Sequence, residues 1–258
     1  MKSIFEERAI TFERKDKSVL TVDKDGVRLR GAKKDIDISF ENTIYVEAQK
    51  YATENRHYFI LAPQKDGAEL IQLDTDIDAN HHTHNILETK TILTAFAASK
   101  LGRKFPNNLD DLEINLGRTI ARKDFILSHG EIIGPQKKLA LKDIQRAACR
   151  GAVLSNIFIY TNEKKRLFEK PQMTVPANVL SLYIVEAALT RNTGHGIDFS
   201  QVDPMTGMEN SEYLILRYLD SNFFVNEEDG FDSDWAKVVH DRIENYGWDI
   251  NMIVGQED

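Results

Sequence analysis

Three histidines crowd one short polar segment of the sequence, and clustered imidazoles are common ligands of zinc and nickel. They are His81, His82 and His84, and Asp76 or Asp78 could add a carboxylate. Adjacent histidines seldom reach one metal ion with good geometry, and no two histidines have the His-x-x-x-His spacing that one helix face would need. We therefore interpret the segment as a polar loop before a helix and expect no cofactor, with a metal-dependent enzyme as an alternative.

Basic residues gather on a predicted hairpin near the start of the chain. Lysine and arginine at a strand end can hold a phosphate group through charge-assisted hydrogen bonds. Aspartates in the same turn oppose an anion, so a lipid head group or a nucleic acid is an alternative ligand rather than the favoured one. The candidate anion-binding residues are Lys24, Arg28, Arg30, Lys33 and Lys34.

A second set of basic residues recurs further along the chain and could contact nucleic acid. Residues 1–202 carry a charge of only +3, because 27 acidic residues are interleaved with 30 basic ones. This modest charge argues against nucleic-acid binding as the main function. The residues of this set are Lys137, Lys138, Lys142, Arg146, Arg150, Lys164, Lys165 and Arg166.

Cys149 is the only cysteine, so the chain cannot form an internal disulfide. Arg146 and Arg150 flank it and would lower the pKa of its thiol if both lay close to the sulfur. No histidine stands nearby in the sequence to act as a base, so we interpret Cys149 as a small buried hydrophobic residue. The sequence also lacks Gly-x-Ser-x-Gly, His-Glu-x-x-His and phosphate-loop motifs.

The last quarter of the chain is strongly acidic. Residues 203–258 hold 14 acidic and three basic residues, a formal charge of −11 in a chain whose total is −8. Solvating acidic tails are poor in aromatic residues, whereas this segment is rich in them. The segment therefore either packs on the second repeat or binds a protein partner, which could be basic, and we expect any partner surface of the chain to lie here. The residues expected at that surface are Phe223, Phe224, Phe231, Trp235 and Trp248.

The elements that must position these residues recur along the chain. In two stretches, strands with period-2 alternation flank a glycine-containing turn, which predicts a hairpin at residues 18–31 and another at 122–134. A further strand precedes each hairpin and others follow it. These outer strands are predicted at residues 10–14, 35–40, 57–61 and 70–73 in the first half, and at 112–116, 138–144, 156–161 and 166–168 in the second.

One amphipathic helix closes each half. The first is predicted to open at Asn85, with Glu88 three residues on as in a capping box. The second is predicted to have Thr174 as its N-cap and Pro176 in its first turn, and to end at residues 192–194. Each half is therefore a run of short antiparallel strands followed by one helix, which is an α+β organisation.

This order of strands and one terminal helix resembles the pleckstrin-homology-like superfold, present here in tandem. The resemblance implies that each half is a bent antiparallel sheet or open barrel, capped by its C-terminal helix. It predicts the first repeat at residues 1–106, the second at 107–193, and a mixed acidic and aromatic extension at 194–258. It also implies that partners lie against exposed sheet edges, in the groove beside the helix, or on the hairpin loops. The alternative is a helix packed on one face of an open antiparallel sheet.

These features together predict a non-enzymatic protein-binding or scaffold protein. The longest apolar runs are far shorter than the roughly 20 residues of a membrane-spanning helix. The N-terminal residues lack the apolar core of a signal peptide, and the chain holds a single cysteine. We therefore expect a cytoplasmic protein without membrane insertion.

Overall fold

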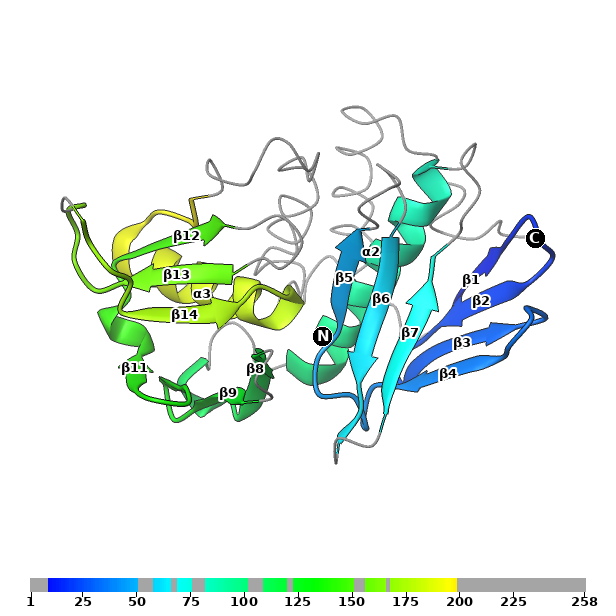
Figure 1. Ribbon diagram of the computed structural model, residues 1–258, viewed down its shortest axis with the longest axis horizontal. Coiled ribbons are helices and arrows are strands. Elements are labelled where there is room, and N and C mark those ends of the chain that lie inside the picture. The colour runs from blue at the N-terminus through cyan, green and yellow to red at the C-terminus, as the bar shows by residue number, and fades with distance from the viewer. Residues whose placement is uncertain are drawn as a thin grey trace, which may run out of the picture. The chain divides into compact units, whose positions relative to one another are not determined.

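The computed structural model divides the chain into two compact units, which we treat separately. The described residues of the first unit lie between 9 and 101, and those of the second between 109 and 198. Among them the fold is α+β, with four antiparallel sheets and two α-helices (Figure 1). The structure describes residues 9–50, 58–65, 69–75, 82–101, 109–119, 123–150, 156–165 and 168–198.

The first unit contains a four-stranded sheet, a three-stranded sheet and one helix, in that order along the chain. Each sheet keeps its strands in sequence order, so neighbouring strands are joined by simple antiparallel connections. The elements are β1 (Ile10–Glu13), β2 (Val19–Val22), β3 (Gly26–Arg30), β4 (Ile36–Ser39), β5 (Glu47–Lys50), β6 (Tyr58–Pro63), β7 (Leu70–Asp74) and α2 (His82–Leu101).

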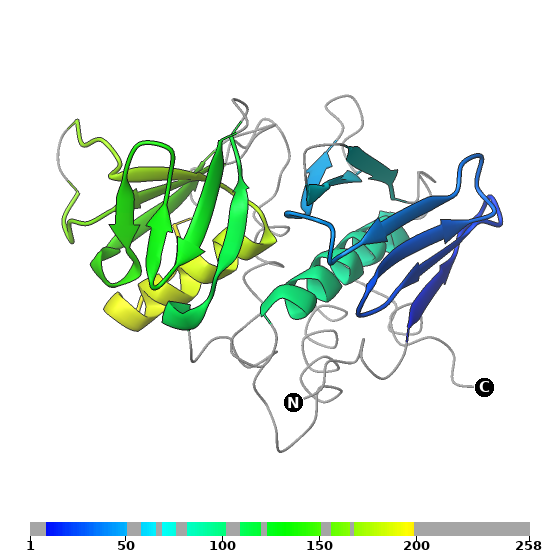
Figure 2. The same cartoon turned by 90° about the horizontal axis from the view of Figure 1, so that it is seen from below.

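Alternation of buried and exposed residues builds the core of this unit. Phe12 on β1 and Leu20 on β2 are opposite each other in the register and both face inward. Helix α2 contacts strands of both sheets (Figure 2). Its Phe96 meets Phe40 edge to face, with ring centroids 5.5 Å apart and planes at 72°. Aromatic pairs prefer this arrangement, so the contact fastens the helix to the end of β4.

A buried ion pair joins the end of β1 to α2. Arg14 donates from Nε to Oε1 of Glu88 at 2.9 Å and from Nη2 to Oε2 at 2.7 Å. The two side chains are 8% and 0% exposed. A bidentate pair of this kind fixes orientation as well as distance, and either charge left alone in the interior would be costly.

The second unit has the same order of a four-stranded sheet, a three-stranded sheet and a helix. Strand β14 of its second sheet contacts β8 of its first, and the helix contacts both sheets. The elements are a 3-10 turn η3 (Leu109–Asp111), β8 (Ile114–Arg118), β9 (Asp124–Ser128), β10 (Glu131–Ile133), β11 (Lys138–Ala140), a 3-10 turn η4 (Leu141–Asp143), β12 (Arg146–Arg150), β13 (Asn156–Tyr160), β14 (Met173–Pro176) and α3 (Val179–Thr193).

Asn178 caps α3 and ties it to β8. Its Oδ1 accepts hydrogen bonds from the backbone N–H groups of Leu180 and Ser181, and its Nδ2 donates to the carbonyl oxygen of Leu116 at 2.6 Å. The Ser181 hydroxyl accepts from the Asn178 backbone N–H, which completes a capping box. Gly117 has φ +127°, and a Cβ there would lie 2.7 Å from Asn178 Nδ2, so the close approach requires glycine.

Three sequence predictions about this fold are wrong. Thr174 does not cap α3 and Pro176 does not lie in its first turn, because both residues belong to β14, and the cap is Asn178. The strand predicted at 166–168 is absent at Phe168, which lies in a turn, and β14 takes that place in the sheet. The helix predicted to open at Asn85 begins at His82.

The remaining strand and helix predictions agree with the structure to within a few residues. Gly194 ends α3 in the left-handed conformation, at φ 74°, as the predicted helix end requires. The strand predicted at 138–144 is shorter than expected, because η4 follows β11 directly. Within the described residues, neither helix is long and apolar enough to cross a membrane.

The Arg14–Glu88 pair provides a test of this fold. Arg14→Met removes the bidentate arginine partner of the buried Glu88 carboxylate, which should lower the stability of the first unit by about 3 to 5 kcal/mol. Native-state hydrogen exchange read by mass spectrometry should show faster exchange in β2 and α2, with β13 of the second unit unchanged.

Arg28→Met is the matched control. It removes an ion pair with Asp23 in which the arginine side chain is 44% exposed, so the expected loss is at most about 1 kcal/mol. Equal losses in the two variants, or no loss in Arg14→Met, would contradict the role given to the buried pair.

Candidate functional site

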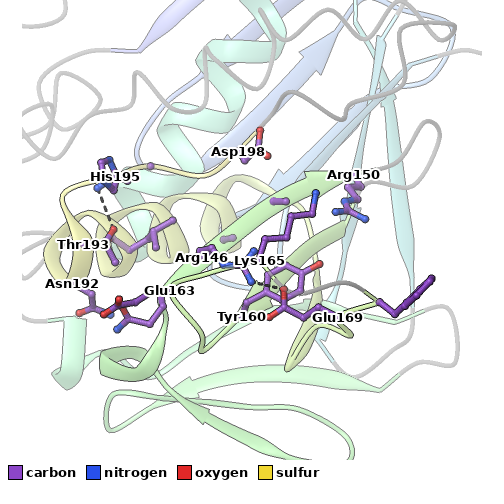
Figure 3. Close-up of a pocket in the computed structure, with 16 residues that line it drawn as sticks. Arg146, Arg150, Tyr160, Glu163, Lys165, Glu169, Asn192, Thr193, His195 and Asp198 are labelled. Atoms are coloured by element: carbon purple, nitrogen blue, oxygen red, sulfur yellow. Dashed lines mark hydrogen bonds and ion pairs between the residues drawn. The ribbon is translucent and has the colours of Figure 1, made fainter.

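A pocket of about 860 Å³ opens in the second unit. It lies where β12, the C-terminal turn of α3 and the loop after β13 come together. Figure 3 shows Asn192, Thr193 and His195 on one side of it and Arg150 on the opposite side. Ligand sites usually have volumes of a few hundred to about 1,000 Å³, so this pocket is large enough to hold a ligand.

The edge of β12 forms one wall of the pocket. β12 pairs with β13 along one side only, because it is the first strand in its sheet. The chain that follows α3 returns to the other side, where Asp198 forms a parallel bridge to Ala148. Cys149 N donates to Asp198 O, and Asp198 N donates to Ala147 O, both at 2.9 Å. The edge therefore accepts an extended backbone segment.

Neighbouring Ile197 anchors this returning segment. Its side chain is buried, and its backbone N–H donates to Oε2 of Glu186 on α3 at 2.6 Å. The segment of residues 195–198 is thus held both to the helix and to the sheet edge.

Alternation along β12 places three side chains on the face that lines the pocket: Arg146, Ala148 and Arg150. The Arg146 guanidinium lies 4.6 Å from the centre of the Tyr160 ring, and that of Arg150 lies 5.3 Å from the centre of Phe158. Such cation–π contacts hold the two arginines over the neighbouring strand. The small side chain of Ala148 between them leaves space above the sheet.

Arg146 makes hydrogen bonds to the loop after β13. It donates from Nε to the carbonyl oxygen of Asn162 at 2.8 Å and from Nη2 to Oε2 of Glu169. The other oxygen of Glu169 accepts from Asn162 Nδ2 at 3.3 Å. The Arg146–Glu169 pair therefore holds the loop after β13 against β12.

Arg150 is different, because its Nε is buried and makes no hydrogen bond. Buried polar atoms in native proteins are nearly always paired, so a buried donor without an acceptor needs an explanation. Arg150 also lines the ligand-sized pocket, so its guanidinium is a candidate group for holding a bound acceptor.

The rim of the pocket carries an aromatic ring in an unusual setting. Phe168 is 92% exposed and has φ 60°, which is uncommon for a residue that is not glycine. Exposed Lys165 and Glu163 stand on the same loop. On the opposite side, Asn192 Nδ2 donates to the carbonyl oxygens of Leu141 and Ile144 at 2.7 and 2.9 Å, which fixes η4 against α3.

The predicted anion-binding residues lie on the first unit, where carboxylates offset most of their charge. Arg28 pairs with Asp23, and Lys24 Nζ lies 3.4 Å from Asp25. Arg30 pairs with Asp37 at 2.6 Å and lies 3.8 Å from Asp35. Lys33 and Lys34 are exposed in the turn before β4. The hairpin thus supplies its own counter-charges, which weakens the case for an anion site there.

The other predicted sites are only partly covered by the described residues. The backbone of His82 and His84 forms the start of α2, whereas His81 lies outside the described residues. In the part of the chain that the structure describes, no three histidine, cysteine or acidic residues are grouped to hold a metal ion. The predicted partner-binding residues also lie outside it: Phe223, Phe224, Phe231, Trp235 and Trp248.

Sequence reasoning found only part of this pocket. Arg146, Arg150 and Lys165 were predicted as basic residues that could contact nucleic acid, but nothing placed them together. Phe168 and Asn192 were not singled out for a site. The alternation of Arg146, Ala148 and Arg150 is the one local signal that could have indicated two like charges on one face of a strand.

Comparison of the chain with protein-family models and with curated proteins finds no match. The function is therefore inferred from the residues and geometry of the pocket itself.

Cys149 faces away from the pocket into the core, so its thiol should be unreactive in the folded protein. The side chain is fully buried, and burial raises the pKa of its thiol from 9.0 to about 12. Between pH 9.0 and about 12 the thiol of the unfolded chain loses its proton, whereas the buried thiol of the folded chain keeps it. The free energy of unfolding should therefore fall as the pH rises through this range. At about pH 8, Ellman's reagent should react with urea-unfolded protein but not with the folded chain.

Stoichiometric reaction of the folded protein within minutes would contradict this assignment. It would mean that the thiolate is accessible and that the arginines on either side lower its pKa after all.

Proposed function

We propose that this protein is a non-enzymatic binding or scaffold protein made of two pleckstrin-homology-like units, and that the pocket beside β12 receives a short extended segment of a protein partner. One observation carries the proposal. The chain's own Asp198 makes two backbone hydrogen bonds with the edge of β12, at the wall of a ligand-sized pocket. Addition of an extended segment to a sheet edge is a recurrent mode of peptide recognition.

The order of elements supports the assignment of the fold. Both units have four strands, then three strands, then a helix, which is the order expected of an open barrel capped at its C-terminal end. β12 is the fifth strand of its unit and α3 is the terminal helix. The groove between these two elements is one of the places where the resemblance implies that partners bind.

The chemistry of the pocket favours a peptide over a small apolar molecule. Small-molecule sites are lined mostly by apolar side chains, with a few polar groups that orient the ligand. This pocket is instead lined on several sides by polar and charged residues, with apolar surface from Ala148, Tyr160, Phe168 and Leu189. Such a lining suits a protein segment, which offers backbone polar groups and mixed side chains.

The hydroxyl of Thr193 also fits binding better than nucleophilic catalysis. It donates to the carbonyl oxygen of Leu189 at 2.9 Å and accepts from the backbone N–H of His195 at 3.1 Å. A nucleophilic hydroxyl would be hydrogen-bonded to a basic side chain. The aromatic residues of the acidic extension stay proposed as a further contact with the partner.

Filling the pocket tests the proposal. A library of random short peptides displayed on phage is selected against the purified full chain, and enriched peptides are measured against variants. Ala148→Trp places a bulky ring in the space above the sheet and should weaken these peptides at least about tenfold, because it occupies the binding volume.

Thr174→Trp is the matched control, because Thr174 belongs to the same sheet but does not line the pocket. It should leave the affinities unchanged, and both variants should keep the wild-type circular dichroism. Enrichment of no peptide, or equal affinity of the selected peptides for Ala148→Trp and the wild type, would refute the proposal.

A further inference from the structure

We infer that the pocket selects a partner segment in which one acidic side chain stands next to an apolar one, with Arg150 binding the carboxylate and Phe168 covering the apolar side chain. This inference rests on the proposed function, namely that the pocket binds a protein segment. It adds the chemical class of the segment and the two residues that recognise it.

The two arginines of β12 differ in their hydrogen bonds, and this difference favours a carboxylate ligand. Arg146 already donates to Asn162 and pairs with the Glu169 carboxylate, so its charge has a partner within the protein. Arg150 stacks on Phe158, and its buried Nε has no acceptor. A carboxylate is the acceptor that best matches a guanidinium, because it takes two parallel N–H donors at once. The stacking contact holds the guanidinium in place before the ligand arrives, which lowers the entropic cost of binding.

The pocket lining holds three lysine or arginine residues and three carboxylates, so its charge balance does not favour a ligand with many negative groups. Arg146 and Glu169 neutralise each other, which leaves Arg150 and Lys165 as cations. Asp198 and Glu163 line the same pocket and would repel a second negative group. A run of acidic residues, or the phosphates of a nucleic acid, would meet both of these carboxylates. A segment with a single acidic side chain fits the balance better.

Phe168 favours an apolar side chain next to the acidic side chain of the ligand. Its ring is 92% exposed on the rim, and its backbone is held at φ 60°. Both an exposed phenylalanine and a left-handed backbone at a non-glycine residue are costly, and such features concentrate at binding sites. Ile126, at 42% exposure, is the other large exposed hydrophobic residue described in this unit, and it lies outside the pocket.

Arg150 and Phe168 line the same pocket, so one segment lying in it can contact both. Side chains on the same face of a strand are about 7 Å apart, so the space above Ala148 begins one such step from Arg150. Phe168 lines the same pocket from the loop side. An extended ligand whose acidic side chain lies above Ala148 therefore presents an adjacent side chain to the rim.

The experiment repeats the phage selection with random short peptides on the full-length wild type and on Arg150→Gln. Wild-type selections should converge on Asp or Glu at one position beside an apolar residue. Selections on Arg150→Gln should still enrich peptides but lose the acidic residue at that position. Wild-type peptides should bind Arg150→Gln about tenfold more weakly, as expected for the loss of a charged hydrogen bond.

Four further variants separate recognition from loss of structure. Arg150→Lys keeps the charge, so the acidic preference should persist with weaker binding. Phe168→Ser should weaken the same peptides and relax the apolar preference. Ile126→Ser and Lys142→Gln are the controls, because both residues are exposed and lie outside the pocket, and they should change nothing.

The possible failures are distinguishable. If no peptide is enriched on the wild type, or if binding does not depend on Ala148, the proposed function fails. If peptides depend on Ala148 but show no acidic residue, or keep it on Arg150→Gln, only the present inference is overturned. Selection of acidic runs on the wild type would also overturn it.

Discussion

The edge of β12 that faces away from β13 is the constraint on which the arrangement of the second unit depends. An edge strand exposes backbone donors and acceptors that must meet water, another segment or a partner. Here the segment that follows α3 pairs with part of this edge, since Asp198 makes backbone hydrogen bonds to Ala147 and Cys149. Because Asp198 lies only four residues beyond Gly194, the end of the helix must stand beside this edge. The groove between strand and helix follows from that short connection, and the loop after β13 makes it a pocket.

The same alternation that builds the core also builds the site. One face of β12 sends Cys149 into the interior, where burial keeps its thiol protonated. The other face carries Arg146 and Arg150, which stack on the aromatic residues of β13. One arginine is then used to fasten a loop, and the other keeps a buried donor without an acceptor. Structural and binding roles are thus divided between two residues that the sequence presents as equivalent.

Local signals in the sequence predicted much of the fold, and non-local contacts explain the rest. The hairpins and the end of α3 were predicted because turn glycines and alternation are encoded within a few residues. β12 was not predicted, since Ala147, Ala148 and Cys149 have little strand preference and take their conformation from pairing with β13. Asn178 was missed as the cap because β14 continues to Pro176, two residues before it. The pocket joins three segments far apart in the chain, and no spacing rule brings Arg150, Phe168 and Asn192 together.

The central proposal is that a partner segment binds in the pocket over β12. The most direct measurement is by NMR on full-length protein with methyl-labelled alanine and ring-labelled phenylalanine, bound to an unlabelled peptide from the wild-type selection. Intermolecular NOEs from the peptide to the Ala148 methyl group and to the Phe168 ring are the predicted result. NOEs confined to labelled residues outside the pocket, such as Ala32 in the turn after β3, would contradict the account.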